Sequence, residues 1–217
     1  AANVVTDAFP DPVSTAFVAT GQEFPDALSG VPAAARYEAP LLLTEHGGLP
    51  TPTKAALQAL QPERIVILGG DVAVSDDVQQ ELKSFASDVD RLAGGDRFGT
   101  GVAVSKDAFV GARTVYVATG RNFPDALAAG PLAPAANLPS VLTDPNDLPR
   151  SSQFALVLGA EQVIVAGGPA SGSGSGGSGP GIGSPGATGA GSAIVPAAPH
   201  AGGSQPLRPA RLHWRHA

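Results

Sequence analysis

Short apolar runs rich in β-branched residues alternate along the chain with Ala- and Leu-rich runs of helical periodicity. Gly, Pro and Asp residues separate the runs where the period changes. Apolar runs of about five residues fit the strands of a parallel sheet that helices cover on both faces. The pattern therefore predicts an α/β fold of Rossmann or Toprim-like (βα)4-type units, with parallel sheets joined by right-handed crossovers.

The chain contains an internal repeat. Eight of the ten residue types in Ala19–Leu28 return in Ala118–Leu127, at an offset of 99 residues. Weaker matches keep nearly the same register, and they include Asp7–Phe9 with Asp107–Phe109 and Ile65–Gly70 with Val163–Gly168. A fixed period over several blocks indicates tandem copies of one structural unit and favours repeated binding or assembly over a single catalytic centre.

The period predicts a first repeat over residues 1–88, a second over 89–170 and a tail over 171–217. The first repeat lacks a counterpart of the opening segment Val89–Thr100, and the second lacks the last helix. Gly, Ser, Pro and Ala dominate the tail, so we expect it to be disordered. It is either a flexible linker or the product of a frameshift or artificial terminus that replaced the last helix.

The expected elements follow from these runs. In the first repeat we expect a helix around 3–9 and a helix over 76–85 that Ser75 caps. In the second we expect strands at 89–93, 114–118, 140–142 and 162–166, and helices at 100–109, 124–133 and within 149–158.

Composition and charge exclude several classes of function. The chain has no cysteine, which excludes disulfides, thiolate metal sites and cysteine nucleophiles. No apolar run approaches the roughly 20 residues that span a bilayer, and the N-terminus lacks the pattern of a signal peptide. The two repeats hold 10 basic and all 19 acidic residues, a net charge of −9. Without a basic run, this charge disfavours nucleic acid as a partner.

The repeated ATGxxFPDAL motif places polar groups where a strand gives way to a helix. A proline begins the predicted helix, and the aspartate lies in its first turn, where it complements the helix dipole. The alternative is a ligand site, since open α/β sheets bind ligands at the carboxyl ends of their strands. The candidates are Thr20 and Asp26 in the first copy and Thr119 and Asp125 in the second. We favour the structural role.

Other motifs argue against catalysis. Gly69-Gly70 closes a strand without completing a nucleotide-binding pattern, which favours a tight turn. His46 is the only histidine within the repeats. A Ser/His/Asp triad or a zinc hydrolase would have to use it, so both are disfavoured. The segment that joins the copies offers Arg91, Asp96, Arg97 and Thr100. Either an Asp–Arg pair fixes this turn, or Arg97 binds a phosphate or carboxylate of a polymer.

Taken together, these motifs resemble the cell wall binding repeat type 2 family. The resemblance covers Asn3 to Ala170 and rests on RLAGGDRFGT, both ATGxxFPDAL segments, LLLTEHGGLP, SVLTDPNDLP and ILGGDVAVSDDV. It implies a secreted, peptidoglycan-associated module at the cell surface of Gram-positive bacteria, which binds an anionic secondary wall polymer of the teichoic-acid type non-covalently. Modules of this family usually occur in threes, in a pseudo-threefold assembly, and accompany separate domains such as amidases.

This resemblance completes the functional expectation. We expect a non-catalytic anchor whose partners are the wall polymer and further repeats, or other copies of itself. No cofactor is expected, although a divalent cation could bridge two anionic partners. An α/β enzyme of nucleotide or sugar-phosphate type and a self-associating surface-layer protein are the alternatives. The candidate polymer-binding residues are Arg91, Asp96, Arg97, Thr100, Arg121, Thr20, Asp26, Thr119 and Asp125.

Overall fold

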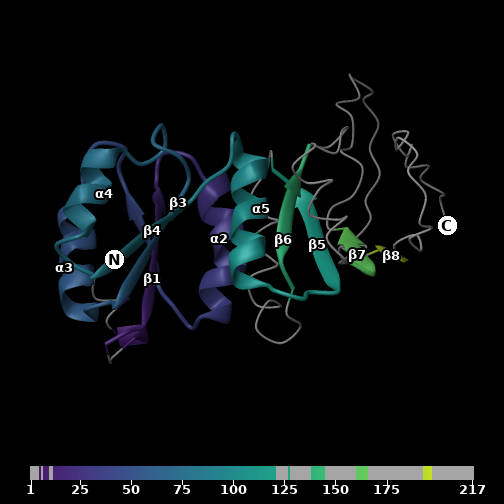
Figure 1. The fold of residues 1–217 in the computed structure, drawn as a ribbon, viewed down its shortest axis with the longest axis horizontal. Helices are drawn as coiled ribbons and strands as arrows, with labels where there is room; N and C mark the ends of the chain where they lie inside the picture. The colour runs from purple at the N-terminus through teal and green to yellow at the C-terminus, as the bar shows by residue number, and fades with distance from the viewer. Residues whose placement is uncertain are drawn as a thin grey trace, which may run out of the picture.

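The computed structural model describes residues 5, 7–9, 12–120, 127, 138–144, 160–165 and 193–196. The first part of the chain forms a parallel sheet with the strand order β2-β1-β3-β4 (Figure 1). Its elements are β1 (Thr15–Thr20), α2 (Pro25–Arg36), β2 (Leu41–Thr44), α3 (Thr51–Leu60), β3 (Arg64–Leu68), α4 (Asp76–Leu82) and β4 (Asp88–Leu92).

A second sheet follows, with the strand order β6-β5-β7-β8. Its elements are β5 (Thr114–Thr119), β6 (Ser140–Thr143), β7 (Gln162–Val165) and β8 (Ala193–Pro196), and α5 (Arg97–Ala108) precedes them. Phe17 pairs with Leu41 in the first sheet, and Tyr116 pairs with Ser140 in the second, so the register repeats at the offset of 99. The predicted α/β fold with parallel sheets is confirmed.

Most predicted element positions agree with the structure within a few residues. The helix expected at 76–85 ends at Leu82, and Ser75 caps it as predicted, because its hydroxyl accepts a hydrogen bond from the Val78 N–H. The helix expected at 100–109 begins at Arg97, three residues earlier, because Asp96 caps it. Val5, Asp7 and Ala8 are helical. The helices expected at 124–133 and 149–158 lie outside the described residues, except that Leu127 is helical.

Strand β4 belongs to the second repeat by sequence and to the first sheet by its pairing. Residues from 89 onward were assigned to the second repeat, yet β4 pairs in parallel with β3 and completes the first sheet. The apolar pattern predicts that a strand is present, but it does not specify which neighbour that strand pairs with. The second repeat in the sequence therefore contributes a strand to the first sheet.

Strand β8 adds order to the tail that the sequence predicts to be disordered. It pairs antiparallel with β7, and Ile164 lies opposite Ile194. This stretch contains Ile194 and Val195, whose β-branched side chains favour strands, in contrast to the Gly- and Ser-rich sequence before it. The expectation of disorder is thus corrected for these four residues, and the rest of the tail lies outside the described residues.

The two central strands of the first sheet, β1 and β3, are buried on both faces. Alternate strand residues, such as Val18 and Ile67, face a cluster that includes Leu57 of α3 and Leu82 of α4. The others face a cluster that α2 and α5 cover; it includes Phe17, Ala19, Val66, Leu68, Ala33, Val104 and Phe109. Because both faces are covered, the strands read as continuous apolar runs.

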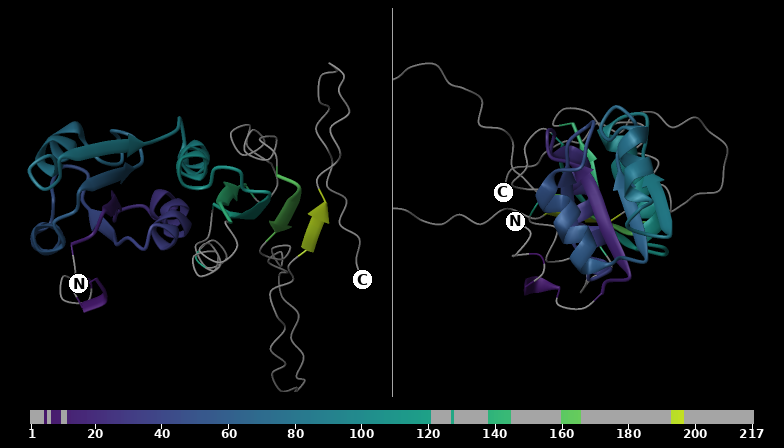
Figure 2. Two further views of the ribbon diagram at one scale, coloured as in Figure 1. Left: turned by 60° about the horizontal axis from the view of Figure 1, so that its bottom comes forward. Right: turned by 90° about the vertical axis from the view of Figure 1, so that its left-hand side faces the viewer.

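Helices α2 and α5 lie between the two sheets (Figures 1 and 2). Leu28 of α2 and Phe98 of α5 pack in one cluster with Tyr116, Ala118 and Leu142 of the second sheet. The two helices approach closely at Gly101, where a Cβ atom would lie 3.0 Å from the Ser29 hydroxyl oxygen. Among the described helices, none is long and apolar enough to cross a membrane.

Candidate functional site

The two sequence motifs meet at the carboxyl ends of the first sheet's strands. Helix α2 begins at Pro25 with Asp26 in its first turn, and α5 begins at Arg97. The Asp26 carboxyl forms a side-chain hydrogen bond with Thr100. An Arg97 Nη2 atom lies 3.3 Å from the Glu23 carboxylate. The ATGxxFPDAL motif of the first repeat therefore contacts the DRFGT segment of the second.

Asp26 occupies a crowded and largely desolvated position. A Cβ atom on Gly69 would lie only 2.4 Å from Asp26 Oδ2, and Gly69 has a φ of +102°, so two constraints favour glycine there. The Oδ1 atom is buried without a hydrogen-bond partner among the described residues. Burial raises the pKa of Asp26; the Thr100 hydrogen bond and the Arg97 charge oppose this rise, and Glu23 adds to it.

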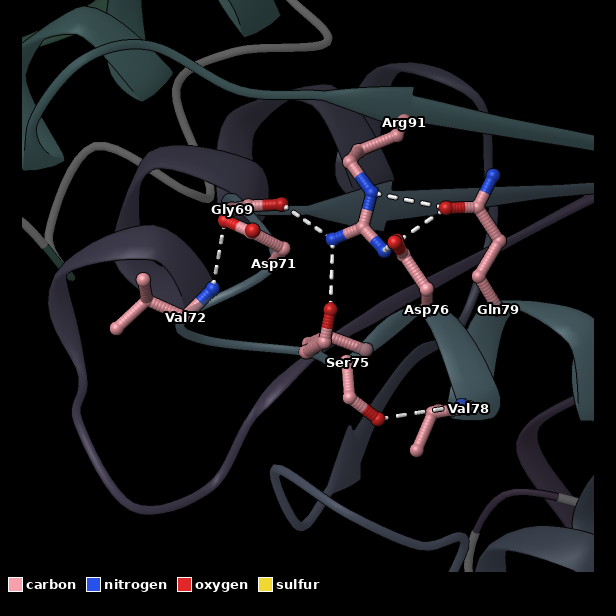
Figure 3. Close-up of polar contacts among 9 residues, drawn as sticks. Gly69, Asp71, Val72, Ser75, Asp76, Val78, Gln79 and Arg91 are labelled. Carbon is pink, nitrogen blue, oxygen red and sulfur yellow. Dashed lines mark hydrogen bonds and ion pairs between the residues drawn. The ribbon is translucent and has the colours of Figure 1, made fainter.

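Arg91 holds the loop between β3 and α4 (Figure 3). Its Nη1 donates to the carbonyl oxygens of Gly69, at 3.0 Å, and Val74, at 2.8 Å. Its Nε and Nη2 both donate to Gln79 Oε1. The side chain is only 16% exposed, and Asp76 lies 3.6 Å from it. Most of its N–H groups are thus engaged within the protein, which leaves little for a polymer.

Asp96 and Thr100 fix the turn that opens α5. Asp96 Oδ1 accepts a hydrogen bond of 2.7 Å from the Gly99 N–H, as an N-cap residue does. The buried Thr100 hydroxyl accepts from the Gly94 N–H at 3.3 Å. Its single proton is shared between the Asp96 carbonyl oxygen, also at 3.3 Å, and the Asp26 carboxyl. The sequence suggested an Asp–Arg pair in this turn. The structure instead joins Asp96 to backbone and Arg97 to Glu23.

Arg97 retains an accessible charge at this edge. Its side chain is 41% exposed, and that of Glu23 is 71% exposed. Sequence reasoning missed Glu23, because it occupies a variable position of ATGxxFPDAL and its counterpart is Asn122. Only the opposite charge of Arg97 could have suggested the pairing.

The remaining predicted site residues are two threonines and the polar residues of the second copy of the motif. Thr20 is buried, and its hydroxyl accepts a hydrogen bond of 3.2 Å from the Gln22 N–H. Thr119 is partly buried and engaged in an interaction. Arg121 and Asp125 lie outside the described residues. The structure therefore brings together Asp26, Arg97 and Thr100, while Arg91 serves a neighbouring loop.

The described clefts lie at the opposite, amino ends of the strands. An apolar cleft of about 230 Å³ lies between the end of α5 and the second sheet, and its lining includes Phe109, Val115 and Val141. A polar depression lies between the ends of α2 and α5, at Arg36 and Asp107. Within the described residues, no three His, Cys, Asp or Glu side chains form a metal-binding group. The motif edge lies outside these clefts, and Arg97 and Glu23 are exposed there.

These features define a tandem α/β repeat protein in which the motifs of neighbouring repeats meet at one sheet edge. The chain belongs to the cell wall binding domain 2 family, whose model matches residues 1–79 and 91–175. The resemblance that the sequence motifs indicate is thereby confirmed. The protein is a cell-wall-binding module associated with the wall or surface of Gram-positive cells.

The chain is similar to two curated proteins of Bacillus subtilis. It is 30% identical to N-acetylmuramoyl-L-alanine amidase LytC over 159 residues, which are 73% of this chain and 32% of that protein. It is 36% identical to the amidase enhancer over 126 residues, 58% of this chain and 18% of that protein. The chain thus spans a third or less of the length of these relatives.

Two solved structures from Clostridium difficile share the fold. Cwp6 has a TM-score of 0.68 at 27% identity and covers 76% of this chain and 26% of its own. Cwp8 has a TM-score of 0.62 at 30% identity and covers 70% of this chain and 27% of its own. In both cases the similarity concerns a part of a larger protein.

Proposed function

We propose that this chain anchors a secreted protein non-covalently by binding an anionic secondary wall polymer of the teichoic-acid type. Membership in a cell-wall-binding family supports the general role. The observation that carries the finer proposal is Arg97, an exposed cation where the motifs of two repeats meet. Its pair with the more exposed Glu23 contributes little stability, so a phosphate or carboxylate of the polymer can replace Glu23 as its partner.

The net negative charge of the repeats opposes the approach of an anionic polymer. The repeats carry a net charge of −9, so attraction must come from local cations or from divalent ions. A divalent ion shared between a protein carboxylate and polymer phosphates needs few ligands from the protein. We propose such an ion as a secondary contribution, which retention on walls with and without a chelator measures.

We further propose that this part of the protein is not catalytic. Asp26 and Arg97 stand at helix starts on an open edge, and the Thr100 hydroxyl bonds to the Asp26 carboxyl and to backbone groups. This arrangement suits ligand contact better than an activated nucleophile, which needs an adjacent oriented base. Any amidase activity of the whole protein would then belong to another part of it.

Retention on purified walls tests the role of Arg97. We expect Arg97→Ala to weaken binding roughly three- to fivefold, as the loss of one exposed charge-assisted contact predicts. Arg97→Lys should recover part of it. Arg113→Ala is the matched control, since Arg113 is also exposed and paired with a glutamate, Glu161, but lies at the start of β5. Unchanged retention of Arg97→Ala would remove this residue from the site.

Walls stripped of secondary polymer test the ligand itself. We expect the wild-type chain to bind native walls and to lose most of its binding to stripped walls. Added salt should weaken the binding, since exposed charge pairs are screened. Equal binding to both kinds of wall would overturn the polymer proposal.

A further inference from the structure

The end of α2 places a charged residue where glycine is usually found. The Ala39 N–H donates to the Ala34 carbonyl oxygen at 2.9 Å, and the Glu38 N–H donates to that of Ala35 at 3.3 Å. These two bonds form a Schellman motif, in which the first residue beyond the helix has a positive φ. That residue is Glu38, with a φ of +50°. A side chain is strained in this conformation, and strained residues of this kind cluster at functional sites.

Glu38 lines the polar depression between the ends of α2 and α5. The depression has a volume of about 600 Å³, which is within the range of small-molecule sites. Arg36 and Tyr37 also line it, and both contact buried aromatic rings. The Arg36 Cζ atom lies 5.5 Å from the centre of the Phe109 ring, and the ring centres of Tyr37 and Phe17 lie 5.9 Å apart. These contacts position both side chains before a ligand arrives, which lowers the entropic cost of binding.

The charged groups in this depression are incompletely paired. Arg36 and Glu38 are exposed, and neither forms an ion pair or a side-chain hydrogen bond with another described residue. Asp107 lines the depression from α5 and shares the Arg64 guanidinium with two further aspartates. One cation thus faces three carboxylates, and Asp107 Oδ2 is buried without a hydrogen-bond partner among the described residues. Within this part of the chain, the depression therefore offers both a guanidinium without an anion and carboxylates that are short of donors.

From these charges we infer that the depression binds a small zwitterion of the amino-acid or short-peptide class. The ammonium group of this ligand donates to the Glu38 and Asp107 carboxylates, and its carboxylate accepts hydrogen bonds from the Arg36 guanidinium. Tyr37 offers an aromatic wall to the carbon atoms between the two charges. A neutral sugar could hydrogen-bond to the same groups but would leave their charges uncompensated. The site lies at the amino ends of the strands, away from Arg97, so it is independent of the proposed polymer binding.

Titration of the full-length, ¹⁵N-labelled chain with dialanine tests this inference by NMR. We expect saturable shifts of the backbone amide signals, largest at residues 35–38 and 107–108. Dialanine with an acetylated amine and an amidated carboxylate should not bind. Alanine distinguishes the two sources of the ligand, since tighter binding of dialanine supports a peptide and tighter binding of alanine supports a free amino acid. Absence of saturable shifts with both, equal binding of blocked and unblocked dialanine, or binding of N-acetylglucosamine alone would overturn the inference.

Two glycine substitutions separate the role of Glu38 in binding from its backbone strain. Glu38→Gly should raise the midpoint of thermal unfolding by about 1–3 °C, because the strain is relieved, yet weaken dialanine binding roughly fivefold. Gln61→Gly is the matched control, because Gln61 follows α3 with a φ of +44° and lies outside the depression. This control should gain similar stability and bind dialanine as wild type does. Arg36→Gln should also weaken binding roughly fivefold. Wild-type affinity of Glu38→Gly or Arg36→Gln would overturn the assignment of these charges to the ligand.

Discussion

Two carboxylates and two arginines in one small region have different roles. Asp26 is packed against Gly69 and bonded to Thr100, whereas Glu23, three residues earlier, is exposed. Arg91 uses its guanidinium to hold a loop, whereas Arg97, six residues later, keeps much of its surface exposed. The identity of a side chain therefore decides its role here less than its burial does.

The raised pKa of Asp26 makes stability depend on pH. Well below its ordinary pKa of 3.8, the carboxyl is protonated in both the folded and the unfolded chain. As the pH rises through 3.8, the unfolded carboxyl ionises first, so the folded state loses stability until the pH exceeds the raised pKa. Asp26→Asn removes this loss. The variant should gain stability relative to wild type between pH 3 and pH 7, as urea unfolding at about those values measures.

Asp77→Asn is the matched control for Asp26, because Asp77 lies in the first turn of α4 but is exposed. The stability of this variant relative to wild type measures the effect of removing a charge from the start of a helix when that charge is exposed. If Asp26→Asn instead loses stability relative to wild type as the pH rises, the charged form of Asp26 is favoured in the folded state.

At the scale of elements, α5 is the helix on which both sheets depend. Val104 and Phe109 face the first sheet, and the Ser105 hydroxyl lies 3.4 Å from the carbonyl oxygen of Ser140 in the second. At the start of α5, the Asp96 side chain accepts a hydrogen bond from the Gly99 N–H, and the Thr100 hydroxyl bonds within the same turn. The cap of this helix therefore influences the packing of both sheets.

Removing the cap should cost a measurable part of the stability. We expect Asp96→Ala to lower the free energy of unfolding by about 1 kcal/mol, the usual value of an N-cap side chain. Asp96→Asn keeps an oxygen that accepts the Gly99 N–H and should cost only a few tenths of a kcal/mol. Urea unfolding of both variants distinguishes them. A cost for Asn as large as for Ala would show that the charge, and not the cap, is what stabilises α5.

Local sequence predicted elements well and their partners poorly. The strands around Val115 and Val141 were predictable because apolar runs recur at one period, and the Ser75 cap was predictable from its residue type. The pairing of β4 with β3 was not, since an apolar run does not specify a neighbour. The contact of Glu23 with Arg97 joins residues 74 positions apart, and the motifs give no signal for it.

The same limit applies to the candidate site. The repeated motifs made the regions around Asp26 and Arg97 candidates from the sequence alone. It could not predict that the two would meet, because this depends on how α2 and α5 pack between the sheets. It also could not predict that the Arg91 guanidinium donates to the carbonyl oxygens of Gly69 and Val74. These are backbone groups, which the sequence does not distinguish from others.

At the scale of the whole molecule, the shared layer of α2 and α5 links the stability of the two sheets. The helices approach closely where Gly101 faces Ser29, and α2 and α5 each contact both sheets. A larger side chain at this crossing must therefore disturb both sheets together.

Gly101→Leu tests this coupling. We expect a loss of about 1–3 kcal/mol, typical of overpacking, and faster amide hydrogen exchange in β1 and in β5 alike. Gly95→Ala is the control, because a Cβ atom on Gly95 meets nothing within 4 Å. Faster exchange in only one of the two strands would mean that the sheets unfold separately.

The placement of β4 has a consequence for how such genes duplicate. The second match to the family begins at residue 91, inside β4, so the sequence unit is offset from the unit that folds as one sheet. A recombination breakpoint between residues 87 and 88 would split the first sheet and leave β3 with an open edge, whereas one just after Leu92 would keep it whole. A further copy inserted at that sequence boundary would have to begin with a strand that closes the sheet before it.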